Sequence, residues 1–164
     1  MARRLRPVEL DFVETAPLRL VFTADAAAPA DALYRALAEE TAAWPQWFAA
    51  VTHARATEGG REVRLRGGTR FRETVMAAEP GARYAYRVDV TNAPGPHALL
   101  EEWRLTPTAG GTRVRWTFAA DGGAPLRFAL RLGRPGFDRA FRDAVRALDR
   151  RLATSGGGPA AAAS

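Results

Sequence analysis

Residues 83–90 read RYAYRVDV, and the alternation of side chains in this stretch decides the fold. Tyr84, Tyr86 and Val88 fall at every second position, with charged side chains among the residues between them. Because successive side chains of a β-strand point to opposite faces, this spacing predicts a strand with one apolar and one charged face. Such strands are typical of antiparallel sheets that bury one face and leave the other in water.

The same two-residue period recurs in the next two stretches. In residues 99–105 (LLEEWRL), Glu101 and Trp103 share a face, and in residues 112–118 (TRVRWTF), Trp116 lies on the apolar face. The Arg and Glu side chains on the opposite face are interpreted as cross-strand charge pairs. Turn signals with Gly and Pro separate these stretches, which indicates consecutive hairpins.

Outward from this region, the pattern predicts strand, one or two helices, six strands and a long helix. The first helix begins near Pro29, and the last runs from Pro125 to about Leu152. Pro135 beside Gly136 should bend or break the last helix, which makes residues 125–133 a separate turn or a kinked first half. The predicted strands are 18–23, 51–57, 61–66, 69–78, 83–91, 98–106 and 112–120.

The last helix carries one apolar stripe. Its members recur at spacings of four and three, as on the buried face of an amphipathic helix. A single helix about 10 Å wide cannot fill the concave side of a six- or seven-stranded sheet. The aromatic side chains or a ligand must therefore fill the rest. The stripe consists of Phe137, Phe141, Val145, Leu148 and Leu152.

Three short motifs, taken in order, are similar to one known family. Residues 44–47 (WPQW) look like the W-P-x-W turn of the polyketide cyclase/dehydrase branch of the SRPBCC superfamily, also called START-like or Bet v 1-like. Residues 68–73 (GTRFRE) resemble the G-x-R-F strand opening of that branch, and residues 111–116 (GTRVRW) its G-T-R-V strand. The resemblance extends from Leu18 to Leu152.

The resemblance implies an α+β helix-grip fold, in which a six- to seven-stranded antiparallel sheet curls around the long C-terminal helix. It also implies a hydrophobic ligand between sheet and helix. Some members are aromatase/cyclases, and others carry lipids, quinones or hormones without chemistry. We expect a partly flexible N-terminal segment (1–17), one ligand-binding domain (18–152) and a disordered tail (153–164).

Polar groups on the predicted apolar face are the candidates for chemistry. Buried Glu and Tyr can move an α-proton and hold an enolate, which makes Glu73, Tyr86 and Glu101 the best catalytic candidates. The plainer alternative is that the tyrosine hydroxyls reach backbone or solvent and the carboxylates pair with arginines near the sheet rim. The candidate ligand-binding residues are Trp47, Phe48, Phe71, Glu73, Tyr84, Tyr86, Glu101, Trp103, Trp116, Phe137 and Phe141.

Four arginines near this region, Arg64, Arg66, Arg70 and Arg72, could present a guanidinium to a ligand carboxylate or phosphopantetheine. Their register favours the outer, solvated face. The aromatic stretch 41–51 (TAAWPQWFAAV) is interpreted as a lid over the mouth of the grip. It would act mainly as a hydrophobic plug, with Trp47 and Phe48 at the lip of the cavity.

Composition excludes several classes of protein. There is no cysteine, and the only serines, Ser155 and Ser164, lie in the tail, so thiol and serine nucleophiles are excluded. His53 and His97 are far apart and have no carboxylate at a metal-ligand spacing. No phosphate-binding glycine loop joins a strand to a helix. We expect neither metal nor cofactor.

The net charge of +6 suggests a polyanion partner, but its origin argues otherwise. All 24 basic residues are arginine, and lysine and isoleucine are absent, as a GC-rich bacterial genome would produce. The arginines are also dispersed, so specific nucleic-acid binding is not expected. We expect no secretion signal, no membrane span and a cytoplasmic location. The oligomeric state stays open.

Three functional hypotheses follow. The first is a binder or carrier of a small hydrophobic or aromatic molecule. The second is a polyketide aromatase/cyclase or dehydratase. The third is a protein-interaction domain whose cavity is filled by side chains. A cavity lined only by apolar groups favours the first, and convergent Glu, Tyr and Arg around an open pocket favour the second.

Overall fold

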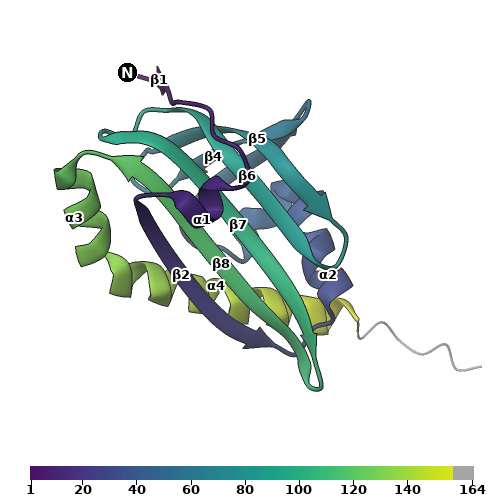
Figure 1. Ribbon diagram of the computed structural model, residues 1–164. Coiled ribbons are helices and arrows are strands. Elements are labelled where there is room, and N and C mark those ends of the chain that lie inside the picture. Colours follow the sequence, from purple (N-terminus) through teal and green to yellow (C-terminus); the bar gives the residue numbers. More distant parts are fainter. Residues whose placement is uncertain (157–164) are drawn as a thin grey trace, which may run out of the picture.

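The computed structural model describes residues 1–156 of the 164-residue chain and contains one strongly curled antiparallel sheet (Figure 1). Seven strands follow one another in the order β2-β8-β7-β6-β5-β4-β3, and the short strand β1 adds to β6. The predicted antiparallel sheet is confirmed. The strands are β1 (Arg3–Arg4), β2 (Leu18–Ala26), β3 (Val51–Thr57), β4 (Gly60–Leu65), β5 (Arg70–Glu79), β6 (Arg83–Thr91), β7 (Pro96–Thr108) and β8 (Gly111–Gly122).

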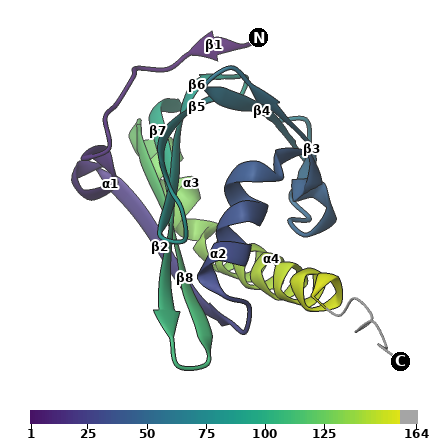
Figure 2. The same ribbon diagram turned by 90° about the vertical axis from the view of Figure 1, so that its right-hand side faces the viewer.

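Apart from the short helix α1 (Phe12–Thr15), the helices lie in two groups on the concave side of the sheet, which wraps around them (Figure 2). The first group connects β2 to β3 and consists of α2 (Ala30–Tyr34), a π-helical turn η1 (Arg35–Glu39) and a 3₁₀ helix η2 (Thr41–Gln46). The second group follows β8 and consists of α3 (Ala124–Leu132) and α4 (Arg134–Ser155). The predicted helix-grip architecture, with a long C-terminal helix in the grip, is confirmed.

The predicted break in the C-terminal helical segment occurs at Gly133. Gly133 ends α3 and directly precedes α4, and Pro135 lies in the first turn of α4. A proline in the first helical turn loses no intrahelical hydrogen bond, so Pro135 helps to start α4 rather than kinking it. The helix α4 continues to Ser155, and residues 157–164 of the predicted disordered tail lie outside the described residues.

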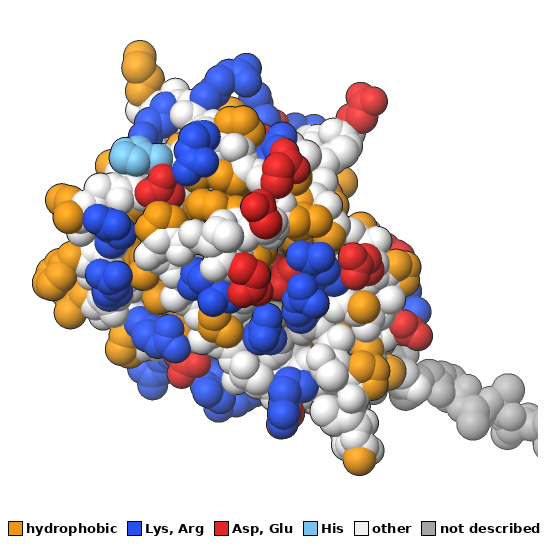
Figure 3. Space-filling model, viewed as in Figure 1, with side chains coloured by type: hydrophobic (Ala, Val, Ile, Leu, Met, Phe, Trp, Pro, Cys, Tyr) orange, Lys and Arg blue, Asp and Glu red, His pale blue; other side chains and the backbone are white. Residues whose placement is uncertain are grey.

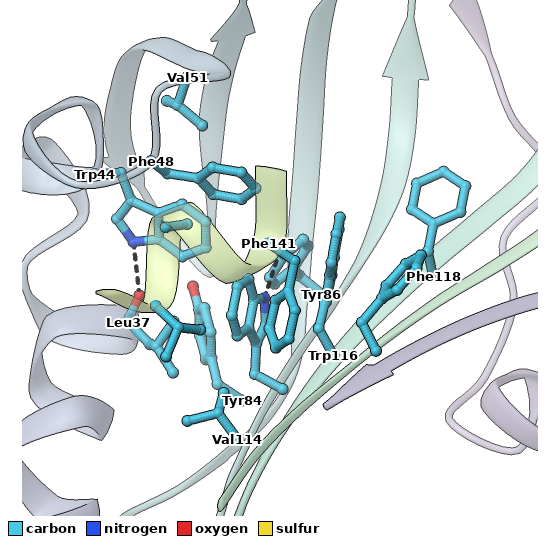
Figure 4. Packing of buried hydrophobic residues seen from close by; sticks show 14 of the residues in the cluster. Leu37, Trp44, Phe48, Val51, Tyr84, Tyr86, Val114, Trp116, Phe118 and Phe141 are labelled. Carbon is cyan, nitrogen blue, oxygen red and sulfur yellow. Dashed lines mark hydrogen bonds between the residues drawn. The ribbon is translucent and has the colours of Figure 1, made fainter. Parts of the chain in front are cut away.

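The inner face of the sheet is aromatic, as the strand alternation predicts (Figure 4). Tyr84, Tyr86, Trp103 and Trp116 are all buried in one core cluster. The rings of Trp103 and Trp116 stack across β7 and β8 at 5.5 Å between centroids. Phe141 of α4 is fully buried against both indoles, so the apolar stripe of the last helix packs where it was predicted to pack.

The outer face of the sheet carries the predicted cross-strand charge pairs. Glu102 of β7 accepts hydrogen bonds from Arg83 of β6 at 2.6 Å and from Arg104 at 2.8 Å. Arg113 of β8 pairs with Asp25 of β2 at 2.9 Å. These pairs confirm the interpretation of the charged face.

The N-terminal segment crosses this outer face. It forms β1 and then a short helix α1 (Phe12–Thr15), and it packs apolar side chains onto the sheet. Phe12 and Val13 of α1 are buried together with Ala98, Leu100 and Ala119 of β7 and β8. The expectation of a water-exposed outer face is therefore wrong over this part of the sheet, because small side chains there leave room for the N-terminal segment.

Candidate functional site

A cavity of about 570 Å³ lies between the inner face of the sheet and the C-terminal helices. Its wall is largely apolar, as a site for a hydrophobic molecule requires. Each group of elements contributes to it: Trp44 and Phe48 from η2 and the loop after it, Phe71 from β5, Trp116 from β8, and Phe137 from α4. Leu126 and Leu130 of α3 complete the wall.

A buried ion pair forms one polar part of the wall. Arg61 of β4 and Glu73 of β5 are directly opposed in the sheet, and the guanidinium Nε donates a hydrogen bond to the carboxylate. The Arg61 Cζ atom lies 4.1 Å from the centre of the Trp44 ring and 3.8 Å from that of Tyr86. With the Tyr84 ring at 5.7 Å, three aromatic rings stabilise the buried cation by cation–π interactions. The Nη1 atom of Arg61 has no hydrogen-bond partner within residues 1–156.

A second buried carboxylate belongs to a hydrogen-bond chain that crosses β6, β7 and β8. The Tyr86 hydroxyl donates to Glu101 Oε2 at 2.7 Å, and the Trp116 indole donates to the same oxygen at 3.0 Å. The Trp103 indole in turn donates to the Tyr86 hydroxyl at 3.1 Å. Three aromatic side chains thus hold Glu101 in one orientation inside the apolar core.

Burial raises the pKa values of Glu73, Glu101 and Tyr86, which favours the neutral form of each group. It raises the pKa of Glu73 to about 7, with a further rise from the Glu101 charge and an opposing effect from Arg61. Burial also raises the pKa of Glu101, although the hydrogen bond from Tyr86 and the charge of Arg61 oppose the shift. The pKa of Tyr86 lies well above its usual value, because of burial and then the Glu101 charge. The two buried carboxyls therefore hold their protons more tightly than carboxyls in water do.

Most of the candidate residues from the sequence converge on this cavity. Those that line it are Phe48, Phe71, Glu73, Tyr86, Glu101, Trp116 and Phe137. The remaining four, Trp47, Tyr84, Trp103 and Phe141, lie in the surrounding core and do not line it. Trp47 packs behind Trp44, with 4.7 Å between the ring centres. Trp44, which was not among the candidates, therefore lines the cavity where Trp47 was expected to do so.

The arginines expected on the outer side lie at or near the surface. Arg64, Arg70 and Arg72 are exposed, and Arg66 lines the cavity while donating a hydrogen bond to the Ala49 carbonyl at 3.2 Å. Arg61 lines the cavity and, like Trp44, was not among the candidate residues. Its signal was the alternation in residues 61–65 (REVRL), which places Arg61 on the inner face with Val63.

Neither histidine takes part in the site, because His53 and His97 are both exposed. Within residues 1–156 no group of three or more His, Asp or Glu side chains could hold a metal ion. The helices in this range are also too short or too polar to cross a membrane.

A curled antiparallel sheet that grips a long C-terminal helix defines the chain as a START-like, SRPBCC protein. Residues 17–153 match the family described as polyketide cyclase / dehydrase and lipid transport, and the chain belongs to this family. The resemblance that the three sequence motifs indicate is thereby confirmed.

Relatives with this sequence pattern occur in mycobacteria. The uncharacterized proteins Rv2574 of Mycobacterium tuberculosis and Mb2604 of Mycobacterium bovis are each 33% identical to this chain over 150 residues. The matched region covers 87% of this chain and 89% of each relative, so the likeness extends over most of both chains.

Solved structures with the same fold are more distant in sequence. A START superfamily protein from Mycobacterium smegmatis matches with a TM-score of 0.64 and 12% identity, over 84% of this chain and 98% of its own. The di-domain ARO/CYC StfQ of the steffimycin biosynthetic pathway matches with a TM-score of 0.68 and 16% identity, over 86% of this chain and 53% of its own. At these identities the likeness establishes the fold.

Proposed function

We propose that this protein binds a flat, largely apolar small molecule in the cavity between the sheet and the C-terminal helices. The observation that carries the proposal is a cavity of about 570 Å³ whose mostly aromatic and aliphatic wall contains one group of buried polar side chains. Ligand pockets of about 300–1,000 Å³ commonly combine an apolar wall with a few polar groups that orient the ligand. The volume also disfavours the alternative of an interaction domain with a filled cavity.

The polar groups define which kind of atom the ligand should present. Arg61 Nη1 is a buried donor without a partner in the described chain, so a ligand oxygen next to it would satisfy the donor. A ligand carboxylate at the same place is disfavoured, because Arg61 already pairs with Glu73 and a second buried anion would have no cation of its own. We therefore expect a carbonyl or hydroxyl oxygen on an otherwise apolar skeleton.

The expected affinity follows from the area that the ligand would bury. Removal of about 300 Å² of apolar ligand surface from water at about 25 cal/mol per Å² contributes roughly 7.5 kcal/mol. Ordering of the ligand reduces this value, and hydrogen bonds to Arg61 or Tyr86 restore part of it. Micromolar affinity corresponds to about 8 kcal/mol, so low-micromolar dissociation constants are expected for the best ligands.

Tryptophan fluorescence provides the test, since Trp44 and Trp116 line the cavity. The purified chain would be titrated with polycyclic aromatics, quinones and fatty acids in the presence of EDTA. We expect a saturable response to oxygen-bearing aromatic molecules and a weaker response to fatty acids. The absence of saturable binding by every compound would contradict the proposal.

A specific observation also favours a catalytic role as second candidate. Glu73 lines the cavity with a pKa of about 7, which is the range in which a carboxyl can both accept and return a proton at neutral pH. Beside it, Arg61 could stabilise an enolate oxygen during cyclisation or dehydration of a polyketone-like substrate. Saturable conversion of a polyketide mimic that Glu73→Gln abolishes without loss of binding would support the enzyme. Binding without conversion would support the carrier.

A further inference from the structure

The helix α3 has a distinct position in the fold, because it covers one side of the cavity while most of its own surface faces water. Leu126 and Leu130 line the cavity, which fixes the inner side of the helix. On its other side, Phe128 is 68% exposed and Leu132 is 72% exposed. Apart from Met1, these two are the only large hydrophobic side chains that are exposed in residues 1–156.

Positive charge surrounds these two side chains. Arg127, Arg131 and Arg134 belong to α3 and the start of α4, and no acidic residue occurs between Asp121 and Asp138. Neither Arg127 nor Arg131 forms an ion pair within the described part of the chain, although many other arginines do. In Figure 3, hydrophobic side chains protrude at the edge where Figure 1 places α3, with basic side chains beside them.

We propose that α3 docks on an anionic lipid surface, with Phe128 and Leu132 inserted at the level of the headgroups. Amphipathic helices with large apolar side chains on one face and arginine at the polar boundary lie in the plane of such an interface. Each basic residue near the surface adds electrostatic attraction to anionic lipid. The surface that we call the α3 face consists of Arg127, Phe128, Arg131 and Leu132, whereas the Arg134 guanidinium donates a hydrogen bond to the Val21 carbonyl of β2 at 3.1 Å.

Two other occupants of the α3 face fit the observations less well. A second copy of the chain on a two-fold axis would place the arginines of one α3 against those of the other, at a cost in like-charge repulsion. An acidic protein would match the charge, but a single helix of nine residues offers much less than the ~800 Å² per partner of a stable protein interface. A lipid surface has neither difficulty, because Phe128 and Leu132 can be buried in its apolar layer without a large complementary interface.

Docking of α3 on lipid does not require the proposed ligand, but it would affect how such a ligand reaches the cavity. Leu126 and Leu130 belong to the same helix as the α3 face and line the cavity. A docked α3 would therefore bring one wall of the cavity to the lipid surface. An apolar ligand could then enter the cavity from lipid without crossing water.

Vesicle co-sedimentation tests the proposal directly. The full chain would be mixed at 0.1 M salt with vesicles of phosphatidylcholine alone or with about one third phosphatidylglycerol. We expect binding to the anionic vesicles and little to the neutral ones. Phe128→Ser/Leu132→Ser should weaken it by about tenfold or more, and Arg127→Gln/Arg131→Gln by roughly twenty-five-fold, at about fivefold per arginine. Both pairs of side chains contribute little to the core, so the variants should fold.

A charge-matched variant separates the α3 face from the overall charge of the protein. Arg64→Gln/Arg150→Gln removes two exposed arginines elsewhere and leaves the same net charge as Arg127→Gln/Arg131→Gln. We expect this control to bind nearly as well as the unaltered chain. An equal loss in both variants, or no binding to anionic vesicles, would overturn the proposal. So would a dimer in light scattering that Phe128→Ser/Leu132→Ser dissolves, because the α3 face would then be a contact between copies.

Insertion depth gives a second readout. In Phe128→Trp, the new indole lies at the proposed contact, whereas Trp44, Trp47, Trp103 and Trp116 are buried. Lipids brominated on the acyl chains should quench the added fluorescence of this variant on anionic vesicles. Unquenched added fluorescence on bound vesicles would show that another surface makes the contact and would overturn the proposal.

Discussion

Arg61 and Glu73 form an ion pair from directly opposed positions on β4 and β5, with side-chain exposed fractions of only 3% and 1%. Removal of one partner of such a pair leaves the other charge buried without compensation. At pH 8 we therefore expect Arg61→Met to lower the free energy of unfolding by about 3–5 kcal/mol.

The double variant Arg61→Met/Glu73→Leu provides the control for this prediction. It removes both charges and keeps apolar volume at the site, so it should be more stable than Arg61→Met alone. Urea denaturation of the unaltered chain, Arg61→Met, Glu73→Leu and the double variant measures the coupling energy between the two side chains. Strictly additive losses would contradict a direct interaction between the two side chains.

The raised pKa of Glu73 predicts an unusual pH dependence of stability. In the folded chain this pKa is about 7, against an ordinary value of 4.5, so the folded state binds a proton more tightly than the unfolded state. The contribution of Glu73 to the free energy of unfolding is therefore greatest below about pH 4.5 and is lost as the pH rises toward 7. Above that range Glu73 adds no further change.

Urea denaturation between pH 5 and pH 8 measures this effect. Glu73→Gln should flatten the decline, although Glu101 will keep part of it because burial raises the pKa of Glu101 as well. Glu58→Gln changes an exposed carboxyl on the β3–β4 turn and should leave the profile unaltered. A profile of Glu73→Gln that parallels the unaltered chain would show that Glu73 does not titrate in this range.

Phe141 is the centre of the contact between α4 and the sheet. It is fully buried, with ring centres 5.8 Å from Trp103, 5.9 Å from Trp116 and 6.1 Å from Phe22. We expect Phe141→Ala to destabilise the fold by about 3–5 kcal/mol, as large-to-small core substitutions do. Phe128→Ala, at an exposed position, should cost less than about 0.5 kcal/mol. A loss below ~1 kcal/mol for Phe141→Ala in a chemical melt would mean that α4 does not grip the sheet.

The strand alternation was sufficient to predict the inner face of the sheet. Trp103 and Trp116 could be assigned to the same face because each lies in a stretch with a regular two-residue period. The apolar stripe on α4 then identified the layer that covers them. Hydrophobic periodicity determines these features locally, so no knowledge of strand order was needed.

Arg61 shows where this reasoning stops. Its alternation with Val63 points inward, but a buried arginine is costly unless a partner and aromatic rings stabilise it. The partner, Glu73, and the rings of Trp44 and Tyr86 come from other elements. Their approach depends on the register of β4, β5 and β6 and on the placement of η2 against the sheet, neither of which the local pattern determines.

The N-terminal segment was missed for a related reason. Its apolar residues are scattered among charged ones, so they form neither a helical nor a strand period. They become buried because Ala98 and Ala119 leave a shallow surface on the outside of β7 and β8. Burial of this kind depends on the shape of the opposite surface rather than on the sequence of the segment itself.

This packing yields a prediction about the N-terminal segment. Phe12 is buried on the outer face, and two backbone hydrogen bonds, Leu5 N–H to Asp89 O at 2.9 Å and Arg6 N–H to His97 O at 2.8 Å, tie the segment to β6 and β7. We expect Phe12→Ala to cost about 3 kcal/mol in the free energy of unfolding. Glu9→Ala, at an exposed position of the same segment, should be nearly neutral. Equal stability of both variants in thermal melts would show that the segment does not hold to the sheet.

A substitution at Ala140 tests the cavity separately from the rest of the core. Ala140 lies on α4 and lines the cavity, one turn from Gly136, which also lines it. Ala140→Phe should place a ring in space that a ligand would occupy, and should therefore weaken binding of the best ligand by about tenfold or more while the melting temperature stays the same or rises.

Ala153→Phe adds the same ring at an exposed position near the end of the same helix, so it should leave both binding and stability unchanged. Fluorescence titration with one ligand from the panel, together with a thermal melt of each variant, measures the two effects separately. A ligand that binds Ala140→Phe as tightly as the unaltered chain must bind elsewhere. A marked fall in the melting temperature of Ala140→Phe would instead show that side chains already occupy the space beside Ala140, which would favour the interaction domain with a filled cavity.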